Sequence, residues 1–293
     1  MNILFIGGTR FFGIEAVNDL IAKGHKVTIA NRGVTKDSFA NKVRRIILDR
    51  TNENSINTAL KGKYFDTVID NIAYSSNDID KVLKAVQCNR YIYTSTMFVY
   101  ENLHINTLEN EFNGNNYPLV YSNRNDYTYD VTKRHAESLL SQKYANLDWT
   151  AVRFPYVTSA NDYSERVLFY VENTINSKPM YVNNLEEKLG FIHCEEAGKF
   201  LSFIADSNFT GTVNASSYGN ISVGEIIRYV ESKTNSKALL VAENKGVTAP
   251  YNNTPEYSLN TDLAKELGFE FSHINSWIFD LLDYYIDLVI SKK

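Results

Sequence analysis

The stretch that predicts the fold follows Met1: Asn2-Ile3-Leu4-Phe5-Ile6-Gly7-Gly8-Thr9-Arg10-Phe11-Phe12-Gly13. Its apolar run predicts a buried parallel strand that breaks into a glycine turn, and a helix then begins near Phe12. Apolar residues recur at helical spacing up to Ile21, Gly24 ends the helix, and a second strand is predicted over 26–30. Such a βαβ unit binds dinucleotides at its first turn. Glycines let the backbone approach a pyrophosphate closely, and the helix N-terminus offers it free N–H groups.

The bulk composition is that of an ordinary globular protein. The 293 residues are 44% hydrophobic and 22% charged, which predicts one large domain and a smaller one. A net charge of −4 argues against nucleic-acid binding, because nucleic-acid-binding domains are usually basic. Two cysteines without a CxxC pair fit a reducing cytoplasm, and five scattered histidines show no metal spacing. No apolar stretch approaches the ~18 residues of a membrane span, so no membrane contact is expected.

The end of the second strand bears on the choice of cofactor. NAD-binding proteins usually place an acid here for the ribose 2′-hydroxyl, whereas NADP-binding proteins use an arginine for the 2′-phosphate. The chain has no acid at this point but carries Asn31 and Arg32. We therefore favour NADP over NAD, with Arg32 as the phosphate contact; the alternative is a surface arginine in a turn.

Several motifs resemble a known superfamily. The Gly7–Gly13 turn resembles the G-x-x-G-x-x-G turn of short-chain dehydrogenases/reductases, with Arg10 in place of the middle glycine. The end of a predicted strand over 90–100 resembles the S-S/T-x-x-V-Y segment of the extended class, and residues 149–155 resemble its W-x-x-x-R-P strand with Phe154 inserted. The chain is identified as an extended, atypical member, similar to NAD-dependent epimerases and dehydratases, of a branch whose turn reads G-G-T-R-F.

The resemblance implies a catalytic set. Tyr129 and Lys133 match a Y-x-x-x-K motif that opens a predicted helix, and their spacing puts both on one helix face. The ammonium would lower the tyrosine pKa from ~10 and bind the nicotinamide ribose, so that the tyrosine acts as general acid or base. Thr96 matches the catalytic Ser/Thr, with Ser95 as the near alternative. Tyr229 and Lys233 repeat the spacing but are interpreted as helix surface.

Further residues are assigned by the same resemblance. The predicted cofactor contacts lie in the glycine turn and at strand ends: Gly7, Gly8, Thr9, Arg10, Phe11, Phe12, Gly13, Asn31, Arg32, Asp49, Arg50, Ala73, Ser95, Phe154 and Pro155. Asp49 matches an adenine contact, or it caps the next helix. Three aromatic residues are predicted to line a substrate cleft: Tyr74, Tyr156 and Tyr163. Residues 101–126 are predicted to form a long loop over the site.

The expected fold class is α/β, a Rossmann-type doubly wound parallel sheet with a smaller C-terminal substrate domain. Residues 1–155 would bind NAD(P), with 190–215 returning to that domain, and 156–293 would mainly bind substrate. The resemblance implies an epimerase or reductase that transfers hydride to or from a sugar, with a nucleotide-linked sugar favoured. A 4,6-dehydratase is disfavoured, because Met97 and Phe98 replace its Asp-Glu pair.

Three questions stay open at this stage. The turn also resembles plastid stem-loop RNA-binding relatives, so the alternative is a catalytically inactive nucleotide- or RNA-binding protein. Among the basic residues of the second half, Arg166, Lys178 and Arg228 are candidates for binding a substrate phosphate without forming a pattern. A homodimer through residues 76–86 and 129–144 is possible, since these helices pair subunits in many relatives.

Overall fold

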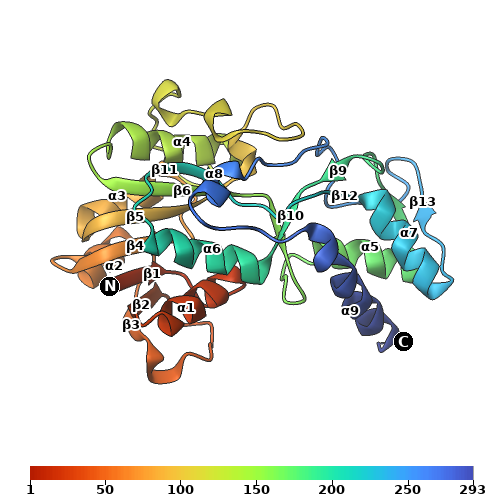
Figure 1. Cartoon of the computed structure of the whole chain (residues 1–293), viewed down its shortest axis with the longest axis horizontal. Coiled ribbons are helices and arrows are strands. Elements are labelled where there is room, and N and C mark those ends of the chain that lie inside the picture. The colour runs from red at the N-terminus through yellow and green to blue at the C-terminus, as the bar shows by residue number, and fades with distance from the viewer. Residues whose placement is uncertain (293) are drawn as a thin grey trace.

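Residues 2–154 and the later strand at 211–214 form a seven-stranded sheet, and the Rossmann-type parallel sheet predicted from the sequence is confirmed (Figure 1). The computed structural model describes residues 1–292. All neighbouring strands pair in parallel, in the order β11-β6-β5-β4-β1-β2-β3. The strands are β1 Asn2–Ile6, β2 Lys26–Asn31, β3 Arg44–Ile47, β4 Tyr64–Asp70, β5 Gln87–Thr96, β6 Asp148–Phe154 and β11 Gly211–Asn214.

Helices cover both faces of this sheet (Figure 1). They are α1 Phe12–Ala22, α2 Glu53–Leu60, α3 Ser76–Ala85, α4 Tyr129–Gln142 and α6 Cys194–Asp206. Ile3 and Phe5 pack with α1 and α6, whereas Leu4 and Ile6 pack with α2, α3 and α4. Because alternate side chains of β1 enter two different cores, the whole strand must be apolar. The continuous apolar run at the N-terminus is therefore a consequence of burial on both faces.

Residues 190–215 lie against the N-terminal part. Strand β11 pairs with β6, and α6 packs on α1. The close approach of the two helices depends on Gly198, because a Cβ there would lie 2.5 Å from the Glu15 Cβ and 2.6 Å from the Ala16 nitrogen. A larger side chain would push the helices apart.

The remaining chain forms a smaller unit with its own core. Its helices are α5 Arg166–Ile175, α7 Val223–Thr234 and α9 Ile278–Ile290, whereas α8 Asp262–Glu266 packs on β11 of the large sheet. Its short strands are β7 Tyr156–Thr158, β8 Pro179–Tyr181, β9 Lys188–Leu189, β10 Phe191–His193, β12 Ile221–Ser222, β13 Leu239–Leu240 and β14 Val247–Thr248. Its apolar core includes Met97 and Val99, which follow β5 directly. The end of β5 is therefore fixed between the two units.

The segment 101–128 packs against α4 and is not a free loop. The Gln142 amide donates to the carbonyl oxygens of Gly114 and Tyr117, each at 2.7 Å, and the Ser138 hydroxyl donates to the Tyr117 carbonyl at 2.9 Å. Residues 132–141 of α4 are all buried within the single chain. Most of the α4 surface is therefore covered within the single chain, and a homodimer through this helix stays a prediction.

Two kinds of element do not occur in the described chain. No helix among residues 1–292 is both long and apolar enough to cross a membrane. The same residues contain no group of three or more His, Cys, Asp or Glu side chains placed to hold a metal ion.

Candidate functional site

A cavity of about 380 Å³ lies at the carboxyl ends of β5 and β6. Ligands of open α/β sheets bind at this edge. Eleven of the residues predicted from the sequence line it: Phe11, Phe12, Tyr74, Ser95, Thr96, Tyr129, Phe154, Pro155, Tyr156, Tyr163 and Arg166. Asp162, Ser164 and Phe98 also line it. From the sequence, Asp162 and Ser164 are not singled out, and Phe98 is named only because a dehydratase would carry an acidic residue at that position.

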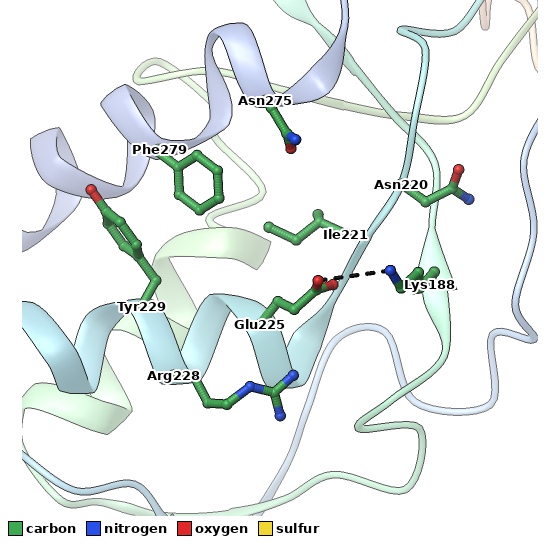
Figure 2. A pocket seen from close by; sticks show the side chains of 8 residues that line it. All are labelled: Lys188, Asn220, Ile221, Glu225, Arg228, Tyr229, Asn275 and Phe279. Atoms are coloured by element: carbon green, nitrogen blue, oxygen red, sulfur yellow. Dashed lines mark ion pairs between the residues drawn. The ribbon is translucent and has the colours of Figure 1, made fainter.

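A larger cavity, of about 450 Å³, lies in the C-terminal unit (Figure 2). It is bordered by α7 and by polar groups such as Lys188 and Glu225, whose charged atoms are 3.8 Å apart. None of the predicted catalytic, cofactor or substrate-cleft residues lines it, but Arg228, a candidate for binding a substrate phosphate, does. Tyr229 also lines it, and its hydroxyl donates to Asp283 at 2.9 Å. Because the smaller cavity holds the catalytic candidates at the sheet edge, we take that cavity as the candidate active site.

Tyr129 and Thr96 meet in the cavity. Tyr129 is the first residue of α4, and its ring lies between those of Tyr74 and Phe98, with centroid distances of 5.5 and 6.1 Å. Burial raises the pKa of Tyr129 to about 12, and a hydrogen bond with the Thr96 side chain opposes this shift. The sequence predicted that Lys133 would lower the pKa of Tyr129, whereas in this structure the pKa is raised, because desolvation outweighs the hydrogen bond with Thr96.

Lys133 lies beneath the cavity, one helical turn after Tyr129. Its ammonium donates to the carbonyl oxygens of Ala73 at 2.9 Å and Thr94 at 2.8 Å and lies 4.5 Å from the centroid of the Tyr93 ring. The residue is 4% exposed, and burial lowers its pKa to about 7. Its two acceptors are neutral, so the amine can change protonation state near neutral pH.

A buried ion pair fixes the end of β5. The Ser95 hydroxyl donates to a Glu137 carboxylate oxygen at 2.5 Å, and Arg153 donates to both oxygens of that carboxylate at 3.1 and 2.6 Å. Ser95 is thus occupied, which leaves Thr96 as the hydroxyl next to Tyr129. Arg153 also donates to the carbonyls of Glu109 and Phe112, at 2.7 and 3.0 Å, and so ties the 101–128 segment to the sheet.

Sequence reasoning gave Glu137 and Arg153 no role. The available signal was spacing: Glu137 follows Lys133 by four residues on one face of α4, and Arg153 precedes the Phe154-Pro155 cavity wall. The spacing of Glu137 and Arg153 in the sequence does not indicate that their side chains contact each other. Their pairing depends on β6 lying next to β5, where Arg153 is in register with Ser95.

The glycine turn fits a dinucleotide. Gly7 and Gly8 have φ of 100° and 81°, in the left-handed region that glycine adopts without strain. A Cβ on Gly13 would lie 3.0 Å from the Gly8 Cα, so side chains would fill the turn. Thr9, Arg10 and Phe11 have backbone N–H groups that donate to no acceptor within residues 1–292. Free amides at a helix N-terminus are what a pyrophosphate requires.

The other cofactor candidates lie at the ends of β2 and β3. Asn31 accepts from the Gly33 N–H at 2.8 Å and donates to the Thr9 hydroxyl at 3.4 Å, which links the two turns. Arg32 is exposed and has no ion pair within the described chain, although its charge contributes to lowering the pKa of Asp49, after the hydrogen bonds from Thr51.

The side chains of Asp49 and Arg50, two predicted cofactor contacts, bond to other residues of the chain. The Asp49 carboxylate accepts from the Thr51 N–H and hydroxyl, at 2.9 and 2.7 Å, whereas Asn52 caps α2. The alternative of Asp49 as the helix cap is therefore wrong. Arg50 donates to both carboxylate oxygens of buried Asp70, each at 2.8 Å. Its guanidinium is held in the interior, so a cofactor would meet Arg50 through its backbone.

Comparisons with known proteins agree with this arrangement. A model of the NAD(P)H-binding family matches residues 7–178. The chloroplast stem-loop binding protein of 41 kDa b from Arabidopsis thaliana is 25% identical over 201 residues, which cover 62% of this chain and 49% of that protein. The chain thus aligns with about half the length of this curated relative.

Solved structures share the fold at low sequence identity. MoeE5 in complex with UDP-glucuronic acid and NAD has a TM-score of 0.75 at 18% identity, with all of both chains covered. The UDP-Glc/GlcNAc 4-epimerase from Campylobacter jejuni has a TM-score of 0.70 at 13% identity, with 99% of each chain covered. Because the family model matches more than half of the chain, the chain belongs to the NAD(P)H-binding family, and the solved structures share its fold.

Proposed function

We propose that the protein is an NAD(P)-dependent oxidoreductase of the epimerase/reductase type that acts on a sugar. The observation that carries the proposal is that Tyr129 and Thr96 meet in one cavity beside the glycine turn, with the Lys133 ammonium buried one helical turn after Tyr129. The fold likeness to proteins solved with UDP-sugars favours a nucleotide-linked sugar as substrate.

The nicotinamide would supply or accept the hydride at a carbon of the substrate, and the chain would handle the proton and the geometry. Tyr129 would exchange a proton with the substrate oxygen, while the Thr96 hydroxyl would hold that oxygen by a hydrogen bond. With a pKa of about 12, Tyr129 is protonated at neutral pH, so it is ready to act as the acid of a reduction. Lys133, with a pKa of about 7, would return the proton to the tyrosine.

The rings around the cavity restrict water. Phe12 packs against Phe154 with a centroid distance of 5.5 Å, and Phe98 packs against Tyr156 at 5.9 Å. Tyr163 is 73% exposed and contacts Phe11 at 5.8 Å, at the rim. An apolar wall next to the reacting carbon strengthens each hydrogen bond that the tyrosine and threonine make to the substrate oxygen.

The test uses Tyr129→Phe with Tyr229→Phe as matched control, because both tyrosines start a Y-x-x-x-K motif. Wild-type protein and both variants are titrated with NADH and NADPH by nicotinamide fluorescence, then assayed with oxidised cofactor and a panel of UDP-sugars. Loss of general acid–base catalysis should lower turnover by ~10²–10⁴-fold in Tyr129→Phe only, with cofactor affinity unchanged. Absence of cofactor binding by the wild-type protein, or full turnover in Tyr129→Phe, would refute the proposal.

A second candidate function is RNA binding, which the similarity to the Arabidopsis stem-loop binding protein favours. The net charge of −4 opposes it. A shift assay with stem-loop RNA over a range of salt concentrations separates the two. Phosphate contacts release counterions, so genuine RNA binding must weaken steeply with salt. Tight, salt-sensitive binding would place this function above the enzymatic one.

A further inference from the structure

The three basic residues that the sequence left without a pattern occupy different surroundings. Lys178 pairs with Glu172 at 2.7 Å, and Arg228 pairs with Glu186 at 3.0 Å, both outside the candidate active site. Arg166 lines that cavity. Within residues 1–292, its guanidinium forms no ion pair with a carboxylate. Of the three cations, only Arg166 is both in the site and without a counterion.

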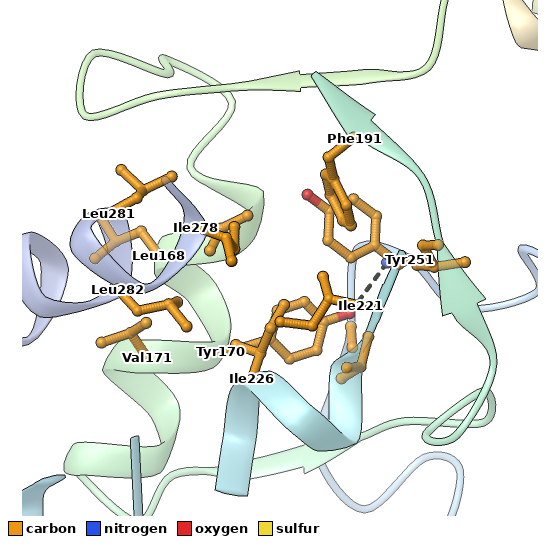
Figure 3. Close-up of a cluster of buried hydrophobic side chains, with 14 of the residues drawn as sticks. Leu168, Tyr170, Val171, Phe191, Ile221, Ile226, Tyr251, Ile278, Leu281 and Leu282 are labelled. Carbon is orange, nitrogen blue, oxygen red and sulfur yellow. Dashed lines mark hydrogen bonds between the residues drawn. The ribbon is translucent and has the colours of Figure 1, made fainter. Parts of the chain in front are cut away.

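The position of Arg166 is fixed by the packing of its helix and by a neighbouring aromatic ring. It is the first residue of α5, a helix fixed in the apolar core through Leu168 and Val171, which lie opposite Leu281 and Leu282 of α9 (Figure 3). The guanidinium carbon lies 5.7 Å from the centroid of the Tyr156 ring, within the range of a cation–π contact. The ring therefore holds the planar guanidinium toward the cavity.

Stability does not account for a cation at this place. The N-terminus of a helix carries partial positive charge, so an arginine in the first turn is electrostatically unfavourable. Asp162 also lines the cavity, but one of its carboxylate oxygens is taken by the Ser164 N–H and hydroxyl, at 2.9 and 2.6 Å. A ligand anion would give the guanidinium the ion pair that it does not form with any carboxylate of the described residues.

The charge of Arg166 also reaches the catalytic candidate. The positive charge of Arg166 acts to lower the pKa of Tyr129 and that of Tyr156, against the rise that burial causes in both. A guanidinium close enough to influence the Tyr129 hydroxyl is close enough to hold a group on the same small substrate. The planar fork of arginine matches carboxylate and phosphate oxygens two at a time.

We infer that Arg166 binds an anionic oxygen group, a carboxylate or a phosphate, on the substrate whose carbinol or carbonyl group meets Tyr129. The inference rests on the proposed function and names the substrate class of that site: a sugar that carries an acid group. The second oxygen of Asp162 has no hydrogen-bond partner in the described chain and is available to a sugar hydroxyl.

The test measures binding by calorimetry in the presence of saturating NADH, with UDP-glucuronic acid, UDP-glucose and glucose 1-phosphate as probes. Arg166→Gln should weaken binding of an anionic probe by roughly 10- to 100-fold, as expected for a charge-assisted hydrogen bond. Arg166→Lys should lose less, and Arg228→Gln, which removes an arginine far from the cavity, should change nothing. NADH affinity should be the same in all four proteins.

The probes separate the two sources of the anion. A loss confined to UDP-glucuronic acid identifies a carboxylate on the sugar, whereas an equal loss with UDP-glucose identifies the phosphates. Wild-type affinity of Arg166→Gln for all three probes, or no binding of any probe to a wild-type protein that binds NADH, would overturn the inference. Binding of a probe that depends on Arg166, without any NADH binding, would support the anion site while refuting the oxidoreductase.

Discussion

Replacing Arg153 by methionine should be among the most damaging single changes in the molecule. The side chains of Arg153 and Glu137 are 0% and 1% exposed, and they meet through hydrogen bonds of 3.1 and 2.6 Å. Methionine would leave the Glu137 carboxylate with only the Ser95 hydroxyl as partner. Breaking a buried pair in this way costs ~3–5 kcal/mol of folding free energy, because an uncompensated charge stays in the interior.

The loss of folding free energy in Arg153→Met comes from the Glu137 charge that is left buried without a partner. A second substitution that removes this charge should therefore make the loss smaller. The double variant Glu137→Leu/Arg153→Met contains no buried charge at this place. It still deprives the carbonyls of Glu109 and Phe112 of a donor, which keeps it below the wild type in stability. We therefore expect the double variant to be more stable than Arg153→Met alone, with a coupling of ~1–3 kcal/mol between the two sites.

The assay is urea unfolding followed by tryptophan fluorescence, since Trp149 lies on the same strand as Arg153. Arg228→Met is the matched control: its partner Glu186 is exposed, and the loss of an exposed pair should cost less than ~1 kcal/mol. Equal losses in Arg153→Met and Arg228→Met, or strict additivity in the double variant, would show that burial of the pair does not have the energetic weight assigned to it.

Three further outcomes are expected. Arg32→Ala should weaken NADPH binding by roughly 10-fold or more without changing NADH binding, because a charge-assisted contact to the 2′-phosphate is lost. The control is Arg44→Ala, on the exposed edge strand. Equal effects of Arg32→Ala on both cofactors would refute the assignment. The difference in unfolding free energy between the wild type and Lys133→Met should increase as the pH rises from about 7 toward 10. The reason is that a lysine with a folded pKa of about 7 binds fewer protons in the folded than in the unfolded state. A difference in urea midpoints that stays constant across this range would contradict the lowered pKa. Gly198→Ala should destabilise by ~1–3 kcal/mol in the same unfolding assay, since its Cβ would overlap α1, and an unchanged midpoint would mean that the helices separate freely.

The parts of the structure that the sequence predicted are those set by local pattern. The strand, glycine turn and helix at residues 2–22 depend on neighbouring residues, and so does the start of α4 at Tyr129. The packing of residues 101–128 on α4 could not be predicted, because it rests on bonds such as that from Gln142 to Gly114, which join residues far apart in the chain. The same holds for the burial that raises the Tyr129 pKa and for the capture of Arg50 by Asp70.

Two buried cations lie on either side of the end of β5, and the chain treats them differently. Arg153 has a carboxylate partner and is held in its charged form, with a pKa raised by Glu137 against the cost of burial. Lys133 has two carbonyl oxygens and an aromatic ring, which orient the ammonium without fixing its charge. An amine that must give up and regain a proton needs such neutral partners, since a carboxylate at hydrogen-bond distance would hold the proton on it. Arg153 therefore belongs to the framework, and the proposal that Lys133 exchanges a proton with Tyr129 draws its support from this contrast.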